Sequence, residues 1–327
     1  MFRIIIILFL ILPFELLSRE GDIYISTNNK ITLQFIKTIK VNTPKSVAFI
    51  PNSNHVWVND LYGKKVWIFD ENNYRLVDKI PCIGQVVEVA FTDLGRNAWV
   101  SYYDKAAVSV FATHDYSVTK TIPVGKIPKV IAVTPDDKYV YVANWESMNI
   151  SVIEKKLQEG ITQIHVGRLP RGIIFTPDGK YAFVALDGEH HLSMIDAVNH
   201  KFIKKIQVGP LPRHLAITRD GKYLYISFYN RNFIKKFDLK TLTVIKEVKT
   251  GLDTRTIALS RNENFLFVTC YKQHTVDVIQ TETLENILTA KVGYKPVGLA
   301  VSEEGDKLWV ANYMGSTLTV FNILENE

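Results

Sequence analysis

Residues 127–153 read IPKVIAVTPDDKYVYVANWESMNISVI, three short apolar runs separated by turn residues. Val130–Val133 predicts a first strand, Tyr139–Ala143 a second, and Ile150–Ile153 the start of a third. Between the first two, Thr134–Lys138 places a proline where a turn fixes φ, with aspartates directly behind it. The stretch therefore predicts a unit of adjacent short strands joined by tight turns.

This unit recurs every 42 residues without an insertion or a deletion. One position of the first strand is alanine or isoleucine in all seven copies: Ala48, Ala90, Ala132, Ile174, Ala216, Ala258 and Ala300. Four residues earlier the copies carry Pro44, Val86, Pro128, Pro170, Pro212, Thr254 and Pro296. A strict period of short strands is typical of a radial array in which each unit buries its surface against its neighbours. We therefore expect an all-β fold, a seven-bladed β-propeller of four-stranded antiparallel blades.

The faces of the predicted strands agree with this arrangement. Residues 139–143 are apolar or aromatic on both faces, as in a strand that is covered on both sides. The fourth strand of a unit is more polar, as in Lys201–Ile206, and its lysines protect an exposed edge. Each unit is thus expected to be a blade packed between two others, with its fourth strand at the rim.

The ends of the chain predict how the ring closes. The seventh unit stops before its fourth strand, whereas residues 31–41 (ITLQFIKTIKV) have the pattern of the other fourth strands. We expect residues 31–41 to pair with the strand around Leu318–Phe321 and to complete the last blade, with a one-residue shift at this junction. The propeller would then span residues 31–327, preceded by an extension over residues 19–30.

The first 18 residues have the composition of an export signal. A basic start at Arg3 is followed by the apolar run Ile4–Leu12 and a polar exit that ends near Ser18. The run is too short for a comfortable membrane span. We expect cleavage near Ser18 and export to a periplasm, a cell surface or the medium, with no stable membrane span afterwards; a retained anchor is the alternative.

Composition and net charge exclude few classes of function. The net charge of +6 on 327 residues permits acidic partners, but nucleic-acid binding needs clustered charge, so nucleic acid is not expected as a partner. The two cysteines, Cys82 and Cys270, fall in the second and sixth units, too far apart in such a ring for a disulfide.

The end of the second strand carries a recurring signature: Tyr141-Val-Ala-Asn144, Phe183-Val-Ala-Leu186, Tyr225-Ile-Ser-Phe228, Phe267-Val-Thr-Cys270 and Trp309-Val-Ala-Asn312. Together with Thr176-Pro-Asp-Gly-Lys180 and Met194-Ile-Asp196, it resembles the YVTN family of seven-bladed β-propellers over residues 31–327. The Trp-Asp and double-glycine signatures of WD40 and kelch repeats are absent from the sequence. The family includes cell-surface and secreted proteins, lactonase relatives and propeller domains of haem d1 enzymes. The resemblance therefore implies a fold and an exported setting, but no single activity.

Basic residues recur directly after the proline position, where the innermost strand begins. The seven copies have Lys45, Val87, Lys129, Arg171, Arg213, Arg255 and Val297. Five cations would thus ring the central funnel, where they can bind a carboxylate, a phosphate or an anionic glycan. The alternative is structural: the cations hold neighbouring blades together.

Aromatic residues recur at the start of the loop between the second and third strands, on the same predicted face. The seven copies have Leu61, Tyr103, Trp145, Asp187, Tyr229, Tyr271 and Tyr313. Tyr, Trp and Arg are typical of binding hot spots, whereas half-buried rings between blades are the structural alternative.

Signals for catalysis are weak. His190, His191, His214 and His274 fall on the same face, but they spread over three blades and lack a metal-ligand spacing, so solvated loop histidines are expected. No covalent haem motif, nucleophile elbow or phosphate-binding glycine loop occurs in the sequence. We expect no cofactor and no metal.

These observations favour an exported, non-enzymatic binding module whose basic and aromatic face binds a protein, a glycan or an anionic small molecule. One alternative is a lactonase-like hydrolase or cyclase that uses Arg213 and His214 with Glu88 or Asp187. A second alternative is a scaffold or redox-partner propeller.

Overall fold

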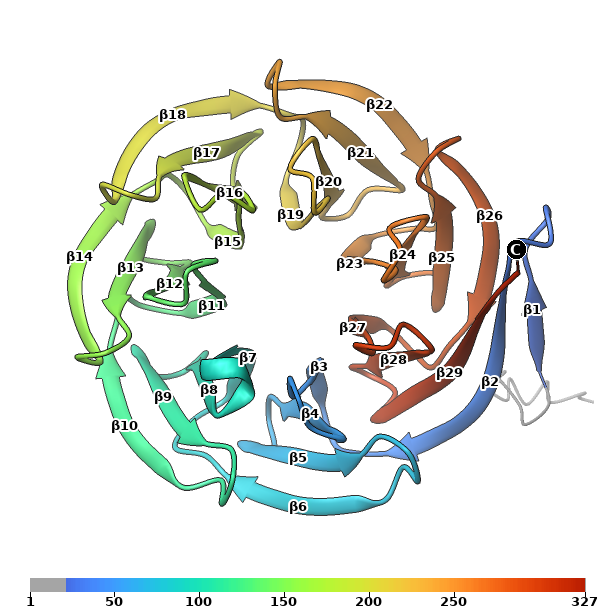
Figure 1. The fold of residues 1–327 in the computed structure, drawn as a ribbon, viewed down its shortest axis with the longest axis horizontal. Coiled ribbons are helices and arrows are strands. Elements are labelled where there is room, and N and C mark those ends of the chain that lie inside the picture. Colours follow the sequence, from blue (N-terminus) through green and yellow to red (C-terminus); the bar gives the residue numbers. More distant parts are fainter. Residues whose placement is uncertain (1–21, 327) are drawn as a thin grey trace, which may run out of the picture.

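The computed structural model describes residues 22–326, which form seven antiparallel sheets arranged radially as a ring (Figure 1). Six sheets have four strands and the last has five. In the described residues, the one helix is the short 3-10 turn η1 (Asp93–Gly95), which lies between the first and second strands of its blade, where the other blades have a tight turn. The predicted all-β, seven-bladed propeller is confirmed.

Each blade begins at the axis with an inner strand and continues outward. The inner strands are β3 (Pro44–Phe49), β7 (Val86–Thr92), β11 (Pro128–Val133), β15 (Pro170–Phe175), β19 (Pro212–Ile217), β23 (Thr254–Leu259) and β27 (Pro296–Val301). The second strands are β4 (His55–Asp60), β8 (Asn97–Tyr102), β12 (Tyr139–Asn144), β16 (Tyr181–Leu186), β20 (Tyr223–Phe228), β24 (Phe265–Cys270) and β28 (Lys307–Asn312). Blades 1 to 7 are numbered in this order.

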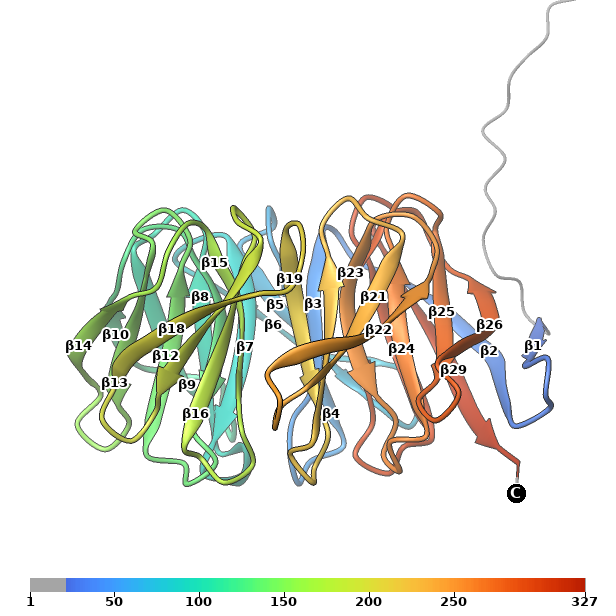
Figure 2. The same ribbon diagram turned by 90° about the horizontal axis from the view of Figure 1, so that it is seen from above.

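The two remaining strands of each blade form its outer half. The third strands are β5 (Lys65–Asp70), β9 (Ala107–Ala112), β13 (Asn149–Glu154), β17 (His191–Asp196), β21 (Phe233–Asp238), β25 (Thr275–Gln280) and β29 (Thr317–Glu325). The outer strands are β6 (Leu76–Pro81), β10 (Val118–Pro123), β14 (Glu159–His165), β18 (Lys201–Gln207), β22 (Thr243–Lys249), β26 (Glu285–Lys291) and, for blade 7, β2 (Ile31–Lys40). Seen from the side, the ring is a short disc whose loops lie on two opposite faces (Figure 2).

The core lies between the blades. Between blades 3 and 4, for example, Tyr141 and Val152 pack with Phe175 and Val184 in one buried cluster, and the rings of Tyr141 and Phe175 meet edge to face at 4.9 Å. Second strands are buried on both faces, as the sequence predicts for a sheet covered on both sides. The outer strands β14 and β18 are instead exposed along the rim except at Ile164 and Ile206, which are buried.

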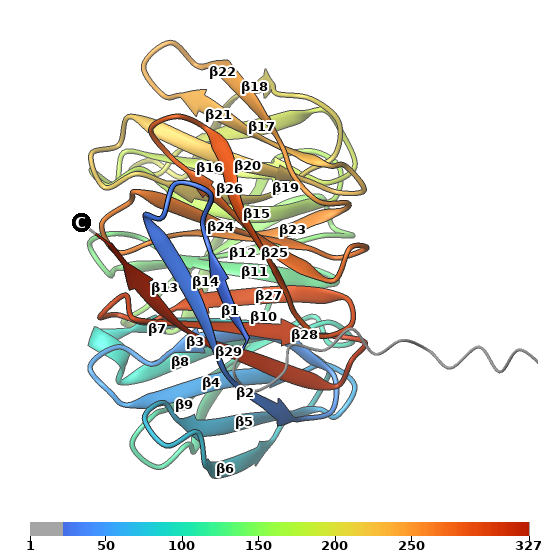
Figure 3. The same cartoon turned by 90° about the vertical axis from the view of Figure 1, so that its right-hand side faces the viewer.

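Strand β2 closes the ring, as predicted. It pairs with β29 in antiparallel register, with Phe35 opposite Phe321 and Ile39 opposite Leu318 (Figure 3). The bulge of β2 lies at Ile36, whereas the corresponding bulge of β6 lies at Val77. The link from the bulge to the next inner strand is therefore one residue shorter at the ring closure than between blades 1 and 2, which explains the predicted one-residue shift.

A fifth strand, β1 (Ile23–Ile25), was not predicted from the sequence. It pairs with β2 on the outside of blade 7. The following turn reaches blade 6, where the backbone N–H of Thr27 donates to the carbonyl of Ile287 at 2.9 Å and Asn28 Nδ2 donates to Gln280 Oε1 at 2.8 Å. The extension therefore ties two blades together at the ring closure.

Other sequence predictions concern the termini and the cysteines. The predicted export signal lies outside the described residues. Cys82 and Cys270 are both free thiols. No helix in residues 22–326 has the length and apolarity to cross a membrane.

Candidate functional site

All five cations of the repeat line a single cavity on the axis, which we call the funnel. Its lining consists of Lys45, Val87, Glu88, Lys129, Val130, Arg171, Arg213, His214, Arg255, Thr256 and Val297. The cavity has a volume of about 20 Å³, which is room for about one water molecule. The predicted convergence of Lys45, Lys129, Arg171, Arg213 and Arg255 is therefore present in the structure, in a much narrower space than a glycan needs.

A bulge at the start of each inner strand turns these side chains inward. In β11 the register against β12 shifts between Pro128 and Ile131, and the equivalent shift occurs in the other inner strands. A bulge re-aims side chains and bends the strand locally. Two consecutive residues, such as Lys129 and Val130, consequently line the funnel together.

Only two of the five cations have a carboxylate partner among the described residues. Arg213 Nη1 lies 3.2 Å from Asp187 Oδ2, and Arg255 Nη2 lies 2.8 Å from Asp253 Oδ2. Both pairs are almost fully buried, so solvent screens them little. Lys45, Lys129 and Arg171 form no ion pair or side-chain hydrogen bond within residues 22–326.

The periodic aromatic side chains pack against the cations. Lys129 Nζ lies 3.9 Å from the ring centre of Tyr103 and 5.3 Å from that of Trp145. The Arg255 guanidinium lies between Tyr229, at 4.5 Å, and Tyr271, at 4.3 Å. Such cation–π contacts favour the charged form without neutralising it.

Two further funnel cations contact aromatic rings in the same way. Arg213 lies 5.3 Å from the Tyr229 ring, and Lys45 Nζ lies 5.1 Å from the ring of Tyr313. The rings thus form the inter-blade packing that was one of the two interpretations. Tyr103 and Tyr229 still expose 39% and 38% of their surface, so aromatic surface remains free for contact.

Burial and mutual repulsion lower the pKa of both lysines and of Arg171 and Arg213. Desolvation, followed by the charges of Arg171 and Arg213, lowers the pKa of Lys129 to about 6. Desolvation and four neighbouring cations hold the pKa of Lys45 well below its ordinary value. Guanidinium groups keep their proton throughout the physiological range. The lysines are therefore the cations whose charge responds to pH.

One carboxyl group of the funnel is shifted in the opposite direction. Desolvation raises the pKa of Glu88, against the effects of the Ser46 hydrogen bond and of Lys45. This buried carboxyl consequently neutralises less of the positive charge than an exposed glutamate would.

The frame that holds the cations was not predicted from the sequence. Ser101 Oγ donates to the carbonyl of Lys129 at 2.7 Å, and Ser227 Oγ donates to that of Arg255 at 2.6 Å, each from the preceding blade. Between blades 4 and 5, Gly172 approaches so closely that a Cβ there would lie 2.6 Å from the carbonyl oxygen of Arg213. The signal in the sequence is the small residue directly before the last residue of most second strands, such as Ser101 and Ser227, and Gly172 itself.

The four histidines do not form a cluster. His190 is exposed, His191 lies near Glu189, and His274 accepts a backbone hydrogen bond from Lys295. His214 differs from the expected solvated loop histidine, because it lines the funnel and its Nδ1 is buried without a partner among the described residues. Desolvation and the adjacent guanidiniums lower the pKa of His214 to about 4, so it is neutral at physiological pH.

Several of the buried polar atoms without a partner belong to residues that line the funnel or contact its cations. Within the part of the chain that the structure describes, they include Asp187 Oδ1, Trp145 Nε1 and Arg255 Nε. Buried polar atoms are nearly always paired in folded proteins, with protein, water or a ligand. No group of three potential metal-ligating side chains occurs in residues 22–326. The unpaired atoms beside the funnel can therefore donate to or accept from a small polar group.

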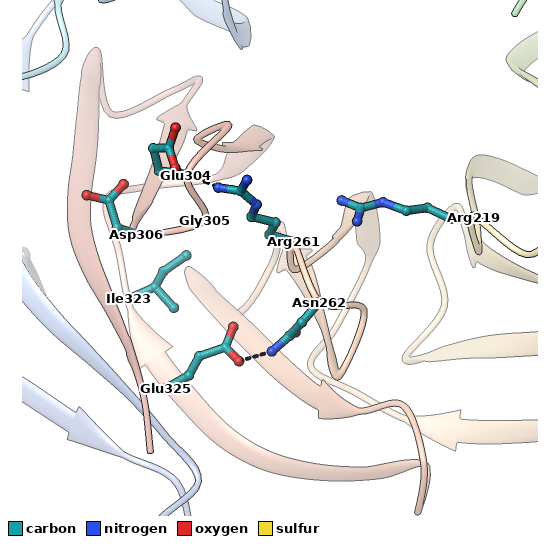
Figure 4. Close-up of a pocket in the computed structure, with 8 residues that line it drawn as sticks. All are labelled: Arg219, Arg261, Asn262, Glu304, Gly305, Asp306, Ile323 and Glu325. Atoms are coloured by element: carbon teal, nitrogen blue, oxygen red, sulfur yellow. Dashed lines mark hydrogen bonds and ion pairs between the residues drawn. The ribbon is translucent and has the colours of Figure 1, made fainter. Parts of the chain in front are cut away.

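The opposite face has an open groove of about 520 Å³ that spans blades 5 to 7 (Figure 4). Its charges already pair with one another: Arg261 Nη1 lies 2.6 Å from Glu304 Oε2, and Asn262 donates to Glu325. Arg219 stands apart from these pairs and is exposed. The groove lacks the unpaired, buried charge that distinguishes the funnel.

Comparisons with known proteins agree with this architecture. Residues 81–226 match the model of the YNCE-like beta-propeller family, and residues 183–292 match that of the cytochrome D1 heme domain. Among solved structures, the Kuenenia stuttgartiensis hydrazine synthase is similar, with a TM-score of 0.79 and 20% identity over 86% of this chain and 96% of that chain. Curated protein sequences give no significant match. The resemblance to YVTN repeats is confirmed at this level: the chain is a seven-bladed β-propeller with a YNCE-like repeat segment.

Proposed function

We propose that the chain is an exported, non-enzymatic binding module that binds an anionic group of its ligand in the funnel. Export is supported by the signal-like residues 1–18. Binding rather than catalysis is supported by a site made of cations and aromatic rings, with repeats that all keep the same length. Catalytic residues are disproportionately found on loops that a rigid scaffold positions, and the loops between the blades of this chain keep a common length without a catalytic insertion.

The observation that carries the proposal is the charge imbalance in the funnel. Five basic side chains converge on one small cavity, and its three guanidiniums stay charged at physiological pH, while Asp187 and Asp253 each pair with one of these guanidiniums. Like charges in a buried site destabilise a protein. An anion that enters the funnel would remove this repulsion and would find the free guanidinium of Arg171, which is suited to bidentate binding.

The size of the cavity limits what enters. Room for about one water admits a small anion or the anionic end of a larger molecule. Tyr103 and Tyr229 contact funnel cations and are partly exposed, so they would be available to contact the rest of a larger ligand. A protein or glycan partner would therefore bind by inserting one acidic group.

Titration calorimetry of purified protein with acetate, inorganic phosphate, a sulfated oligosaccharide and an acidic peptide tests the proposal. Arg171→Gln removes the unpaired guanidinium, and Arg219→Gln, on the opposite face and exposed, is the control. At least one probe should bind to wild type and to Arg219→Gln alike, and about tenfold more weakly to Arg171→Gln, since a charged hydrogen bond contributes about 1.5–3 kcal/mol. No binding of any probe, or binding that Arg171→Gln leaves unchanged, contradicts the proposal.

The similarity to the cytochrome D1 heme domain favours the redox-partner alternative, in which the funnel would hold a haem. The residues present do not fit it: a macrocycle cannot enter a cavity with room for about one water unless the ring of cations moves apart. His214 is the histidine of the lining, and it lies among Arg171 and Arg213. A haem absorption band that saturates at one equivalent of added haem would support the redox-partner alternative. Turnover of a sugar lactone would support the hydrolase alternative.

A further inference from the structure

Lys129 is one of three funnel cations that have no carboxylate partner among the described residues. Its side chain is only 7% exposed, and it lines the cavity. The described residues offer its ammonium no carboxylate and no hydrogen-bond acceptor, only the rings of Tyr103 and Trp145. An ammonium group has three donors that need partners when it is buried.

The charged groups around Lys129 come from several blades. Arg171 of β15 and Arg213 of β19 repel its charge, whereas Asp187, which follows β16, attracts it but is already paired with Arg213. Lys45 of β3 also faces this space and interacts unfavourably with Lys129. Glu88 of β7 lines the same cavity and carries a carboxyl whose ionisation is itself disfavoured by burial.

An anion in the cavity would reverse this balance. A negative charge within about 4–6 Å of an amine favours its protonated form. The free ammonium would then also gain the hydrogen-bond acceptor that it lacks. Binding of an anion and uptake of a proton are therefore coupled in this geometry, and each strengthens the other by the same factor.

We propose that the funnel binds a carboxylate group between Arg171 and Lys129 and that Lys129 takes up one proton when the carboxylate binds. The inference rests on the proposed function. A carboxylate fits because its planar pair of oxygens matches the fork of Arg171, and because the narrow cavity disfavours the tetrahedral oxygens of phosphate or sulfate.

Proton linkage follows from this assignment. Desolvation and Arg171 lower the pKa of Lys129 to about 6 in the free protein, so the amine is mostly neutral at neutral pH. Acetate stays ionised over the same range, because its carboxyl group titrates near the pKa of aspartate. Affinity for acetate should accordingly fall by up to about tenfold per pH unit between about pH 6.5 and 8.5 for a single proton.

Titration calorimetry in two cationic buffers of different ionisation enthalpy measures both affinity and proton uptake. Acetate and phenylacetate are the carboxylate probes, and sulfate is the tetrahedral one. Wild type should take up about one proton per carboxylate near pH 7.5, with sulfate weaker. Tighter binding of phenylacetate than of acetate identifies the carboxylate end of a larger ligand, and equal binding identifies a free small acid.

Two variants separate Lys129 from the other groups. Lys129→Arg keeps the charge at every pH and should bind acetate with a flat pH profile and no proton uptake. Lys129→Met should bind at least tenfold more weakly, while Lys105→Met, exposed and outside the funnel, should behave as wild type. An unchanged pH slope in Lys129→Arg, or pH-independent binding to wild type that Arg171→Gln abolishes, overturns this inference alone. Absence of any anion binding would instead overturn the proposed function.

Discussion

Lys129 lowers the stability of the fold that holds it. Its pKa of about 6 in the folded protein lies below its ordinary value of 10.5, because burial and two guanidiniums disfavour the charge. The folded state therefore binds fewer protons than the unfolded state between these two values. Stability should rise with pH over this window and become independent of this group below it. A side chain that opposes folding is more easily explained by function than by structure.

Replacement of Lys129 by methionine tests this cost directly. Lys129→Met should stabilise the ligand-free protein at neutral pH by about 1–4 kcal/mol, the range found when buried charges give way to apolar side chains. The gain should shrink towards pH 10. Urea unfolding at several pH values measures it, with Lys204→Met on the exposed face of β18 as the control. A destabilised Lys129→Met protein would show that the lysine is a structural residue.

At the level of strands and blades, the repeat predicted the position of every cation but not the contacts between them. The period is gapless, so Lys45 and Arg255 could be placed at equivalent points of the ring from the sequence alone. The carboxylate partner of Arg255 could not be predicted, because Asp253 lies in the link between two blades at a position that is acidic in this unit only. Strand β1 was missed because three residues that pair with their neighbour β2 carry little periodic signal.

Glycine at the contact between blades is the other feature that packing alone explains. Gly172 lies against the backbone of Arg213 in the next blade. Gly172→Ala should destabilise the protein by about 1–3 kcal/mol, the usual cost of overpacking, and should weaken anion binding because Arg213 must shift. Gly160→Ala on β14 is the control, since a Cβ there meets no atom within 4 Å. Equal melting temperatures of the two variants would contradict the close approach.

Across the whole molecule, the ring depends on one strand from the other end of the chain. Strand β2 fills the outer position of blade 7 with the buried side chains of Leu33, Phe35 and Ile39, and it hides the edge of β29. The fold and this closure were predictable because period, strand pattern and the missing fourth strand agree. The small volume of the funnel could not be predicted from the sequence, because it follows from side-chain packing around the axis.

Deletion of residues 19–41 tests the closure. The variant should lose about 5–9 kcal/mol from the three buried side chains alone, comparable to the total stability of a typical domain. It should also aggregate, because the edge of β29 becomes free to pair with other chains. Deletion of residues 22–27, which removes β1 but keeps β2, should cost much less. An unchanged thermal melting curve for the longer deletion would refute the role of β2.

We propose above all that five cations, contributed by five of the seven blades, form one anion site on the axis. Crystals soaked in sodium bromide test it most directly, because bromide is small enough for the funnel and its anomalous scattering marks its position. We predict a strong anomalous peak from bromide in contact with Arg171 and Lys129 in wild-type crystals, and no such peak in Arg171→Gln crystals. Bromide on the surface with none in the funnel would contradict it.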